Sequence, residues 1–414
     1  MTSDRARGAA PRPAIVVDGT QHALSVARNL VRHGVTVYAL TGPREGVRFS
    51  RHVRWIRTAD GGSPHSWERF LLGPDSDYLA GAVLLACSDD AINFIAQNSE
   101  QLSRKFLLEE GDPETRLCLL DKFRTYQKAE EAGIPTVAYE LVDSVAQIHA
   151  VAERFRFPIV IKPLYSPDAA LLGGKIIIAQ TKEDLFEKTR GVRSAVENLG
   201  VRALVMECVP GDDDLLCSYY TYMDENGTPL VEFTKRLLRR SPMHKGIACY
   251  HITDWNPEAA ALGRKFFRHV KLKGLGNIEF KRDLRDGELK VIEANARFTA
   301  GDPIVTKSGI DLAAITYDRL TGRPVSAPPG YRLGMVFWLP AEDIRAFFQL
   351  RKLGKITFRA WLGSIVRTSK LPYFAWRDPA PSLYVNALRA LQLVKALRPR
   401  ISLRRRTVSR ETRR

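Results

Sequence analysis

Cysteine is scarce in this sequence. Five cysteines occur among 414 residues, and no two of them are spaced as C-x-x-C. Their positions are Cys87, Cys118, Cys208, Cys217 and Cys249. An odd and scattered set argues against a disulfide framework and against a cysteine-based zinc site. We therefore expect a protein of a reducing compartment, the cytoplasm.

Long hydrophobic runs are also missing. No segment reaches the roughly eighteen apolar residues that a membrane-spanning helix needs. Residues 1–13 are polar and lack the apolar core of a signal peptide. We expect a chain that is neither exported nor integral to a membrane.

Several common catalytic and nucleotide-binding motifs are absent. Residues 18–23, which follow the first apolar run, lack the glycines of G-x-G-x-x-G, and G-x-x-x-x-G-K-[ST] does not occur. The sequence also has no G-x-S-x-G, no H-E-x-x-H and no convincing cysteine–histidine pair. These absences argue against a dinucleotide site, a Walker A loop and a side-chain nucleophile.

Acidic residues are outnumbered by basic ones. The chain has 63 Lys and Arg against 46 Asp and Glu, a net charge of +17, and residues 395–414 hold nine basic side chains beside Glu411. Such a cluster is typical of a solvated tail, of contact with an anionic membrane or of nucleic-acid binding. We expect no nucleic acid as a partner and leave open a peripheral contact with the inner face of the membrane.

The length predicts two to three folded units. The first, residues 14–119, consists of short apolar runs joined by helical patterns, an order that is typical of a parallel sheet. A polar helix that follows Asp121-Lys122, runs to Ala132 and ends at Gly133 opens the second unit, residues 120–329. The fold class is therefore α/β in the first unit and α+β in the second.

Beyond about residue 330 the sequence changes character. Aromatic residues lie among basic ones, and a mostly apolar helix at 383–397 leads into an arginine-rich end. We interpret residues 330–398 as a basic extension that docks on the main body, with an amphipathic surface for anionic lipid as the alternative. Residues 399–414 are expected to form a disordered basic tail.

The second unit contains two predicted hairpins. Apolar strands at 159–163 and 175–179 flank a loop that ends in Gly173-Gly174 and form the core of a mobile lid at about 135–208. Strands at 276–281 and 289–294 flank the turn Arg285-Asp286-Gly287.

The second hairpin carries the strongest chemical signal. Glu293, Asn295 and Arg297 are two residues apart, so on a strand all three project from one face. If the hairpin places Glu279 near Glu293, two carboxylates and an amide oxygen meet, which suits Mg²⁺ ions that bridge phosphate oxygens. The alternative is a polar stripe that faces solvent.

Basic residues supply weaker signals. Lys162 lies inside an apolar strand and needs an anionic partner, which is either a phosphate or a structural carboxylate. Lys122 precedes a helix and by itself is equally compatible with an ordinary surface position. The loop before Lys175 offers backbone N–H groups and a cation of the kind that wrap phosphates.

The order of these segments resembles the ATP-grasp superfamily. The resemblance rests on Asp121-Lys122, Val160-Ile161-Lys162-Pro163, the glycine loop, Glu207-Cys208-Val209-Pro210-Gly211, Ile278-Glu279-Phe280 and Ile292-Glu293-Ala294-Asn295-Ala296-Arg297. The resemblance covers roughly residues 14–330. Within the superfamily, the chain more specifically resembles the predicted carboxylate-amine ligases, which have a carbamoyl-phosphate-synthase-like fold. It implies an ATP-grasp domain behind an N-terminal pre-ATP-grasp domain.

The resemblance also implies roles for individual residues. Contact with the ATP phosphates is implied for Lys122 and Lys162 and, through the glycine loop, for Lys175. Glu207 and the Val209 backbone would bind the adenine, and Asp213 the ribose, with Asp214 as the alternative. Magnesium, or manganese, would be held by Glu279, Glu293 and Asn295. The glycine loop is less glycine-rich than in the family, and Ala294 is smaller than the usual residue.

The implied reaction joins a carboxylate to an amine through an acyl phosphate and releases ADP and phosphate. Arg297 would face the acyl phosphate, and Lys235, with a lesser expectation for Arg239, would clamp an acidic substrate. The alternatives are an ATP-dependent carboxylase and a non-catalytic nucleotide-binding module recruited to an anionic membrane. The sequence does not identify the acid, the amine or the oligomeric state.

Overall fold

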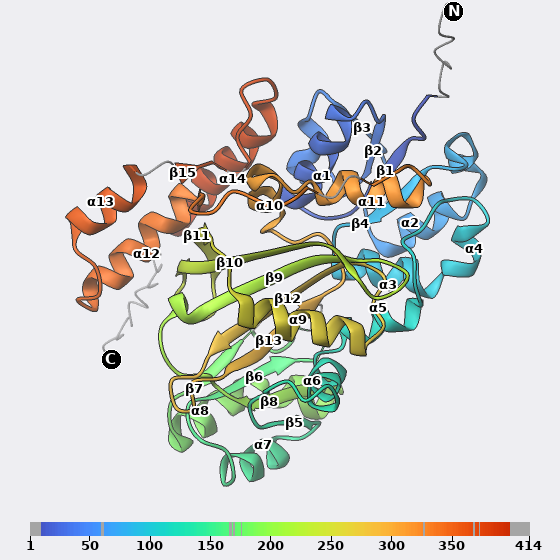
Figure 1. Ribbon diagram of the computed structural model, residues 1–414. Helices are drawn as coiled ribbons and strands as arrows, with labels where there is room; N and C mark the ends of the chain where they lie inside the picture. Colours follow the sequence, from blue (N-terminus) through green and yellow to red (C-terminus); the bar gives the residue numbers. More distant parts are fainter. Residues whose placement is uncertain are drawn as a thin grey trace, which may run out of the picture.

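A computed structural model describes residues 10–58, 62–164, 168, 170–174, 176–325, 328–366, 369–371 and 373–397. Three sheets of four, seven and four strands organise this part of the chain (Figure 1). Lys175 and the tail at 399–414 lie outside the described residues.

The N-terminal region is built on a parallel sheet with the strand order β3-β2-β1-β4, as the sequence predicts. Its elements are β1 (Ala14–Val17), α1 (Gln21–Arg32), β2 (Val37–Leu40), η1 (Gly46–Phe49), β3 (Val53–Trp55), α2 (Pro64–Leu71), η2 (Pro74–Leu79), β4 (Val83–Ala86), α3 (Asp89–Gln97) and α4 (Ser99–Ser103). The loops after β1 and β4 are neighbours at the carboxyl edge of the sheet, where open α/β sheets bind ligands.

A four-stranded antiparallel sheet, ordered β5-β8-β6-β7, follows α5 (Pro113–Leu120) and α6 (Lys122–Glu131), and we call it the small sheet. It contains β5 (Tyr139–Val142), α7 (Val145–Ala152), β6 (Ile159–Pro163), β7 (Ile177–Ala179), α8 (Lys182–Arg193), η4 (Ser194–Asn198) and β8 (Ala203–Glu207). The β6–β7 pairing confirms the first predicted hairpin. One face of this sheet packs Ile159 and Ile161 under α7 and α8. The other face carries Val160 and Met206 toward α6 and β13.

The largest sheet has the order β13-β12-β9-β10-β11-β14-β15 and lies in the centre of Figure 1. Its elements up to the C-terminal part are η5 (Asp213–Leu215), β9 (Leu216–Met223), β10 (Pro229–Ser241), β11 (Ile247–Thr253), α9 (Pro257–His269), β12 (Gly274–Arg282), β13 (Leu289–Asn295), α10 (Asp302–Ser308) and α11 (Leu312–Leu320). Side chains of β9 alternate between its two faces: Tyr219 packs with Phe267 of α9, whereas Tyr220 and Tyr222 join the core shared with the N-terminal sheet.

Two buried aspartates join the C-terminal part to the large sheet and to the N-terminal region. It consists of β14 (Val336–Trp338), α12 (Pro340–Lys352), α13 (Phe358–Val366), β15 (Ser369–Lys370) and α14 (Ala380–Leu397). Asp343 accepts hydrogen bonds from Arg239 of β10 at 2.6 and 3.1 Å and from the indoles of Trp338 and Trp361. Asp378 accepts from Arg28 Nε of α1 at 2.9 Å and from Ser50 Oγ at 2.7 Å.

None of the helices in the described part of the chain is both long enough and apolar enough to cross a bilayer.

Candidate active site

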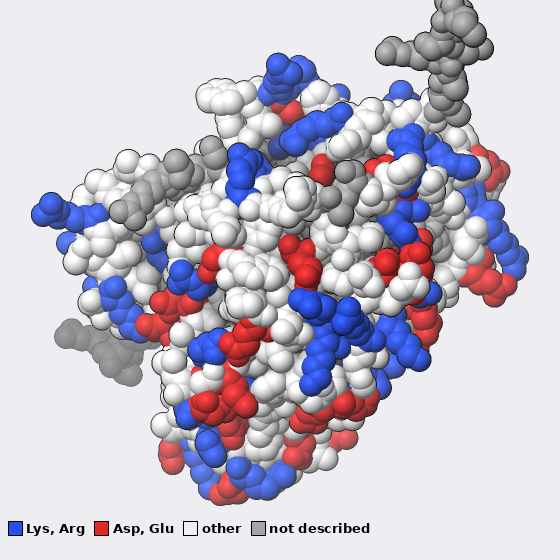
Figure 2. Space-filling model, in the orientation of Figure 1, with Lys and Arg blue, Asp and Glu red and all other residues white. Residues whose placement is uncertain are grey.

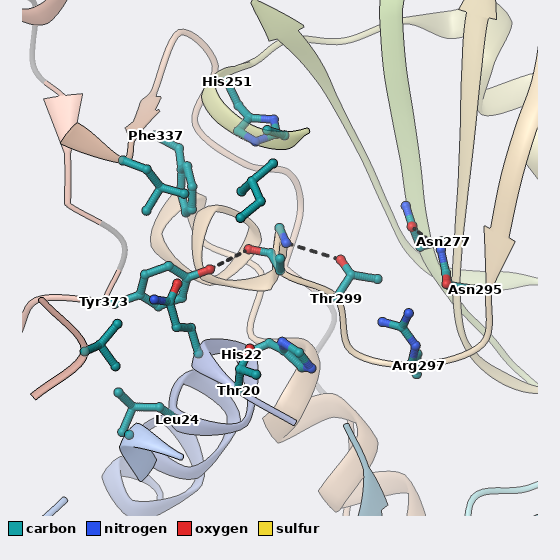
Figure 3. A pocket seen from close by; sticks show the side chains of 18 of the residues that line it. Thr20, His22, Leu24, His251, Asn277, Asn295, Arg297, Thr299, Phe337 and Tyr373 are labelled. Atoms are coloured by element: carbon teal, nitrogen blue, oxygen red, sulfur yellow. Dashed lines mark hydrogen bonds between the residues drawn. The ribbon is translucent and has the colours of Figure 1, made fainter. Parts of the chain in front are cut away.

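A cavity of about 700 Å³ opens where the large sheet meets the N-terminal sheet and the C-terminal part. Its two ends differ in chemistry (Figure 3). Asn277, Asn295 and Arg297 lie on one side of the view, and Phe337 and Tyr373 lie on the other. The polar end is continuous with the second predicted hairpin.

Two carboxylates and two amides face each other across that hairpin. The register of β12 and β13 pairs Glu279 with Glu293, as the sequence predicts, and it also pairs Asn277 with Asn295. All four side chains line the cavity. Asn295 Nδ2 donates to Asn277 Oδ1 at 3.4 Å, which holds the two amides side by side.

This donor set fits a hard divalent cation. Carboxylate and amide oxygens are what Mg²⁺ prefers, and the ion keeps several positions for water or phosphate oxygens. Among the described residues, no group of three or more His, Cys, Asp or Glu side chains is arranged to hold a metal ion. Glu279, Glu293 and Asn295 therefore suit an ion that arrives with a phosphate ligand, rather than a cage made wholly by the protein.

Arg297 directly follows β13 and is held in place by Asp89 at the start of α3. Its Nε donates to Asp89 Oδ1 at 2.6 Å, and one terminal nitrogen donates to the Phe298 carbonyl at 3.2 Å. Burial disfavours the charged guanidinium, but Asp89 and Glu293 outweigh this effect and raise the pKa of Arg297. A permanent cation is thus fixed beside the acid pair.

Lys235 of β10 is a second buried cation of the cavity, with only 3% of its surface exposed. Burial lowers the pKa of its ammonium, while the charge of Glu279 opposes that shift. Nζ lies 3.3 Å from His251 Nδ1, and burial together with Lys235 keeps the pKa of His251 well below its usual value. Neutral His251 therefore accepts from the Lys235 ammonium.

Gly301 permits the close approach of the α10 segment to Lys235. A Cβ atom at Gly301 would lie 2.3 Å from the Tyr220 hydroxyl oxygen and 2.8 Å from Lys235 Cε. A larger residue at position 301 would require the side chains of Tyr220 and Lys235 to shift.

Lys122 and Lys162 lie near the same acid pair. Lys122 Nζ donates to the Leu164 carbonyl at 3.2 Å and shares a narrow cavity with Glu293 and Asn295. Burial lowers the pKa of Lys162, Glu293 opposes that change, and Lys122 adds to it. The helix α6, the small sheet and the large sheet thus bring two lysines and Glu293 into one electrostatic neighbourhood.

The residues expected around adenine and ribose form a separate group at the end of β8. Glu207 accepts from the Arg156 backbone N–H at 2.9 Å and lies 3.5 Å from Arg285. The Val209 carbonyl accepts from Lys281 Nζ at 2.9 Å. Buried Asp213 accepts from the His244 backbone N–H at 3.0 Å.

This group borders Lys162 through Cys208. Burial raises the pKa of the Cys208 thiol, and the charges of Lys281 and Lys162 oppose that change. Glu207, Val209 and Asp213 do not line the large cavity. Asp214 of η5 is exposed, so the choice between Asp213 and Asp214 for the ribose stays open.

Arg239 departs from the expectation that it helps to clamp the substrate. Its guanidinium is bound to Asp343, and the residue does not line the cavity. The alternation of side chains along β10, together with the bulges between Leu237 and Arg240, turns Arg239 toward α12. Arg239 therefore anchors the C-terminal part.

His22 lines the cavity and was missed by sequence reasoning. Its ring hydrogen-bonds through Nε2 to the Cys87 carbonyl, and Nδ1 is buried without a hydrogen-bond partner in the described part of the chain. Burial lowers its pKa from 6.5 to about 4, so the ring is neutral at pH 7. A single histidine after a loop gives no sequence signal; only the pairing of β1 with β4 brings it to Cys87.

The other end of the cavity has a mostly apolar wall beside the polar residues Gln21, Arg44 and Glu45. Its apolar side chains come from α1, η1, β14 and α14 and from the segments that follow β14 and β15, namely Leu24, Val47, Phe337, Leu339, Tyr373, Val385 and Leu388. The Tyr373 hydroxyl donates to the Ala300 carbonyl at 3.1 Å, which ties this wall to the segment before α10.

The three sheets, with the acid pair on the large one and the lysines opposite it, define an ATP-grasp fold. No family model matches the sequence. The chain is 27% identical over 261 residues to the D-aspartate ligase of Enterococcus faecium (strain Aus0004), a match that covers 60% of this chain and 61% of that protein. It is also 27% identical over 183 residues to the carbamoyl phosphate synthase large chain of Methanosarcina barkeri, covering 42% of this chain and 16% of that protein. The chain thus spans less than two thirds of either relative.

Solved structures show the same fold at low identity. The biotin carboxylase domain of Hydrogenobacter thermophilus 2-oxoglutarate carboxylase, in complex with MgADP and bicarbonate, has a TM-score of 0.61 at 17% identity and covers 80% of this chain and 74% of that one. N5-carboxyaminoimidazole synthetase from Staphylococcus aureus, with ADP, has a TM-score of 0.61 at 15% identity, and the match covers 79% of this chain and 82% of that one. L-amino acid ligase from Bacillus licheniformis has a TM-score of 0.57 at 16% identity, and the match covers 75% of this chain and 74% of that one.

Proposed function

We propose that the protein is an ATP-dependent ligase that joins a small carboxylic acid, such as an amino acid, to an amine. The observation that carries this proposal is the convergence of Glu279, Glu293 and Asn295 with Lys162 on one side and Arg297 on the other. Two of the similar proteins are named for such ligations, a D-aspartate ligase and an L-amino acid ligase.

The nucleotide would be ATP with Mg²⁺. Structures of the same fold hold ADP and MgADP, which supports this cofactor. Glu279, Glu293 and Asn295 would hold the metal, which when bound would neutralise charge on the phosphate oxygens. Lys122, Lys162 and Lys175 would bind the phosphates, and Glu207, Val209 and Asp213 would bind the nucleoside.

The chemistry proceeds in two displacements. A carboxylate oxygen attacks the γ-phosphorus, the bond to the β-phosphate oxygen breaks, and ADP leaves. The amine nitrogen then attacks the acyl carbon, loses a proton, and expels phosphate as the amide forms. Lys235 and Arg297 would hold the carboxylate against the triphosphate and stabilise the negative oxygens that develop in both steps.

The apolar end of the cavity indicates the kind of substrate. The cavity has a volume of about 700 Å³, and apolar side chains form part of its wall. It therefore has room for a carboxylate or an amine with an uncharged organic portion. We place the reaction in the cytoplasm, where ATP is supplied.

Incubation of the protein with ATP, Mg²⁺ and pools of organic acids and amines tests the proposal. ADP release that requires both an acid and an amine, with an amide detected by mass spectrometry, is the expected result. Bicarbonate-dependent release without amide would instead identify a carboxylase. ATP binding without turnover in any pool would identify a nucleotide-binding module.

A further inference from the structure

The surface of the C-terminal part is unusually apolar. Ten of the eighteen exposed large hydrophobic side chains in the described residues lie between 344 and 391. Six of them belong to α12, to α13 and to the loop between these helices, and we call this set the α12–α13 face: Ile344, Phe348, Leu353, Phe358, Leu362 and Val366.

Side chains of this set are linked within and between the two helices. On α13, Phe358, Leu362 and Val366 are spaced by four residues and therefore form one stripe, and none of the residues of this helix is buried. The α12 residue Phe347 connects the two helices, because its ring lies 5.3 Å from that of Phe348 and 6.1 Å from that of Phe358. An apolar face of this kind, which the described part of the chain leaves exposed, is typical of an interaction surface.

The exposed charged side chains of residues 340–366, which carry the α12–α13 face, are all basic: Arg345, Arg351, Lys352, Lys355 and Arg359. One of them, Lys355, pairs with the half-exposed Asp212 from outside this segment. The acidic residues Glu342, Asp343 and Asp378 are buried. In Figure 2 the region over α12 and α13 is largely white, with blue patches. Beyond α14, outside the described residues, the sequence adds eight more basic residues and one acidic residue.

We propose that the α12–α13 face docks on an anionic phospholipid membrane. Apolar side chains flanked by lysine and arginine are the composition of helices that lie in the bilayer interface. At thirteen residues, α12 is about 20 Å long, too short to cross the roughly 30 Å hydrocarbon layer, so the helices would lie along the surface. The positive charge matches the negative potential of anionic lipid, whereas a second copy of this face would bring like charges together.

Vesicle sedimentation with the full-length protein tests this proposal without any substrate, so it does not depend on the ligase reaction. Wild-type protein should bind vesicles of equal parts phosphatidylcholine and phosphatidylglycerol about tenfold more tightly than phosphatidylcholine alone, and less tightly as salt rises. Equal binding to both vesicles, or none to either, would overturn the proposal.

Two pairs of variants assign the binding to this face. L362S/V366S removes the exposed apolar stripe and should lower vesicle binding about tenfold or more. R345Q/R359Q should lower binding to anionic vesicles about fivefold or more and weaken its salt dependence. Leu199→Ser and Arg104→Gln, which change an exposed apolar and an exposed basic residue elsewhere, are the matched controls and should bind as wild type does.

Two further outcomes would overturn the proposal. Binding that is unchanged in L362S/V366S would place the membrane contact elsewhere. A wild-type dimer in sedimentation velocity that becomes monomeric in L362S/V366S, without vesicle binding, would show that a second copy covers the face.

Discussion

Glu293 is the residue on which most of the candidate site converges. It pairs with Glu279 across the hairpin, lines both the large and the narrow cavity, and stabilises the charges of Lys162 and Arg297. Two carboxylates placed this close are held together by the cations around them. Removal of one charge therefore alters the whole arrangement.

Glu293→Gln keeps the size of the side chain and removes its charge. We expect ADP release to fall by about 100-fold or more. The proposed Mg²⁺ ion would lose a charged ligand, and the charge on the phosphate oxygens would be less well neutralised. The measurement is steady-state ADP release with saturating ATP and Mg²⁺. Glu288→Gln is the control, since Glu288 is an exposed acid on the same hairpin and pairs only with the nearby Lys290. A wild-type rate of ADP release in E293Q would show that Glu293 is not part of the active site.

His22 predicts a pH dependence of stability. Burial lowers its pKa from 6.5 to about 4 in the folded protein, so between these values the unfolded chain binds more protons than the native one. Its contribution to the free energy of unfolding is therefore complete above pH 6.5 and decreases as the pH falls to 4, by up to about 3 kcal/mol.

Urea unfolding between pH 4 and pH 7 measures this effect. In His22→Gln the free energy of unfolding should fall less steeply with decreasing pH than in the wild type. The control is His33→Gln, which changes an exposed histidine near the other end of α1. Identical slopes for His22→Gln and the wild type would show that His22 does not carry the dependence.

Sequence reasoning reached the polar residues of the hairpin because strand periodicity alone places Glu293 and Asn295 on one face. It did not reach His22 or Lys281. Nothing local marks these residues, since their partners are the Cys87 and Val209 carbonyls, which the fold brings to them from 65 and 72 residues away.

At the scale of elements, a buried carboxylate helps to fix α12 to the large sheet. Asp343 is fully buried and accepts hydrogen bonds from the Arg239 guanidinium and from the Trp338 and Trp361 indoles. A buried pair of this kind adds little when intact, but it is costly to break because one charge stays unpaired.

Asp343→Asn should therefore lower the free energy of unfolding by about 3–5 kcal/mol, since Arg239 would remain buried without its counter-charge. Urea denaturation measures the loss. Glu100→Gln breaks an exposed pair with Arg104 and should cost less than about 1 kcal/mol. A small effect of Asp343→Asn would mean that water reaches Arg239.

Elements were predicted well where the signal is local. Both hairpins of the second unit and the parallel N-terminal sheet follow from short apolar runs and turn residues. The sequence predicted that the C-terminal part docks on the main body, but not which residues attach it. The pairs Arg239–Asp343 and Arg28–Asp378 join residues that are 104 and 350 positions apart, and no local pattern marks them. The proposed domain limits stay a prediction.

At the scale of the whole molecule, three regions share one cavity. The N-terminal region contributes His22 and Leu24, the large sheet contributes the acid pair and Lys235, and α14 contributes Val385 and Leu388. The C-terminal part is therefore one wall of the candidate active site.

Leu388→Glu tests this wall. A negative charge introduced at this partly buried position of the cavity wall should raise the KM of the organic substrate about tenfold or more and leave the KM of ATP unchanged. Steady-state kinetics with each substrate varied separately measures both constants. Asn386→Glu, an exposed position on the same helix, is the matched control. Equal KM values for Leu388→Glu and the wild type would exclude α14 from the substrate site.

The two buried aspartates have a consequence for movement. Asp378 binds the C-terminal part to α1, and Asp343 binds it to β10, so this part acts as a brace across the rim of the cavity. We expect this brace to resist separation of the N-terminal region from the large sheet. Entry of reactants and release of products would then require movement of the small sheet, which carries Lys162 on β6, so each release of product would move that cation away from the position expected for the triphosphate.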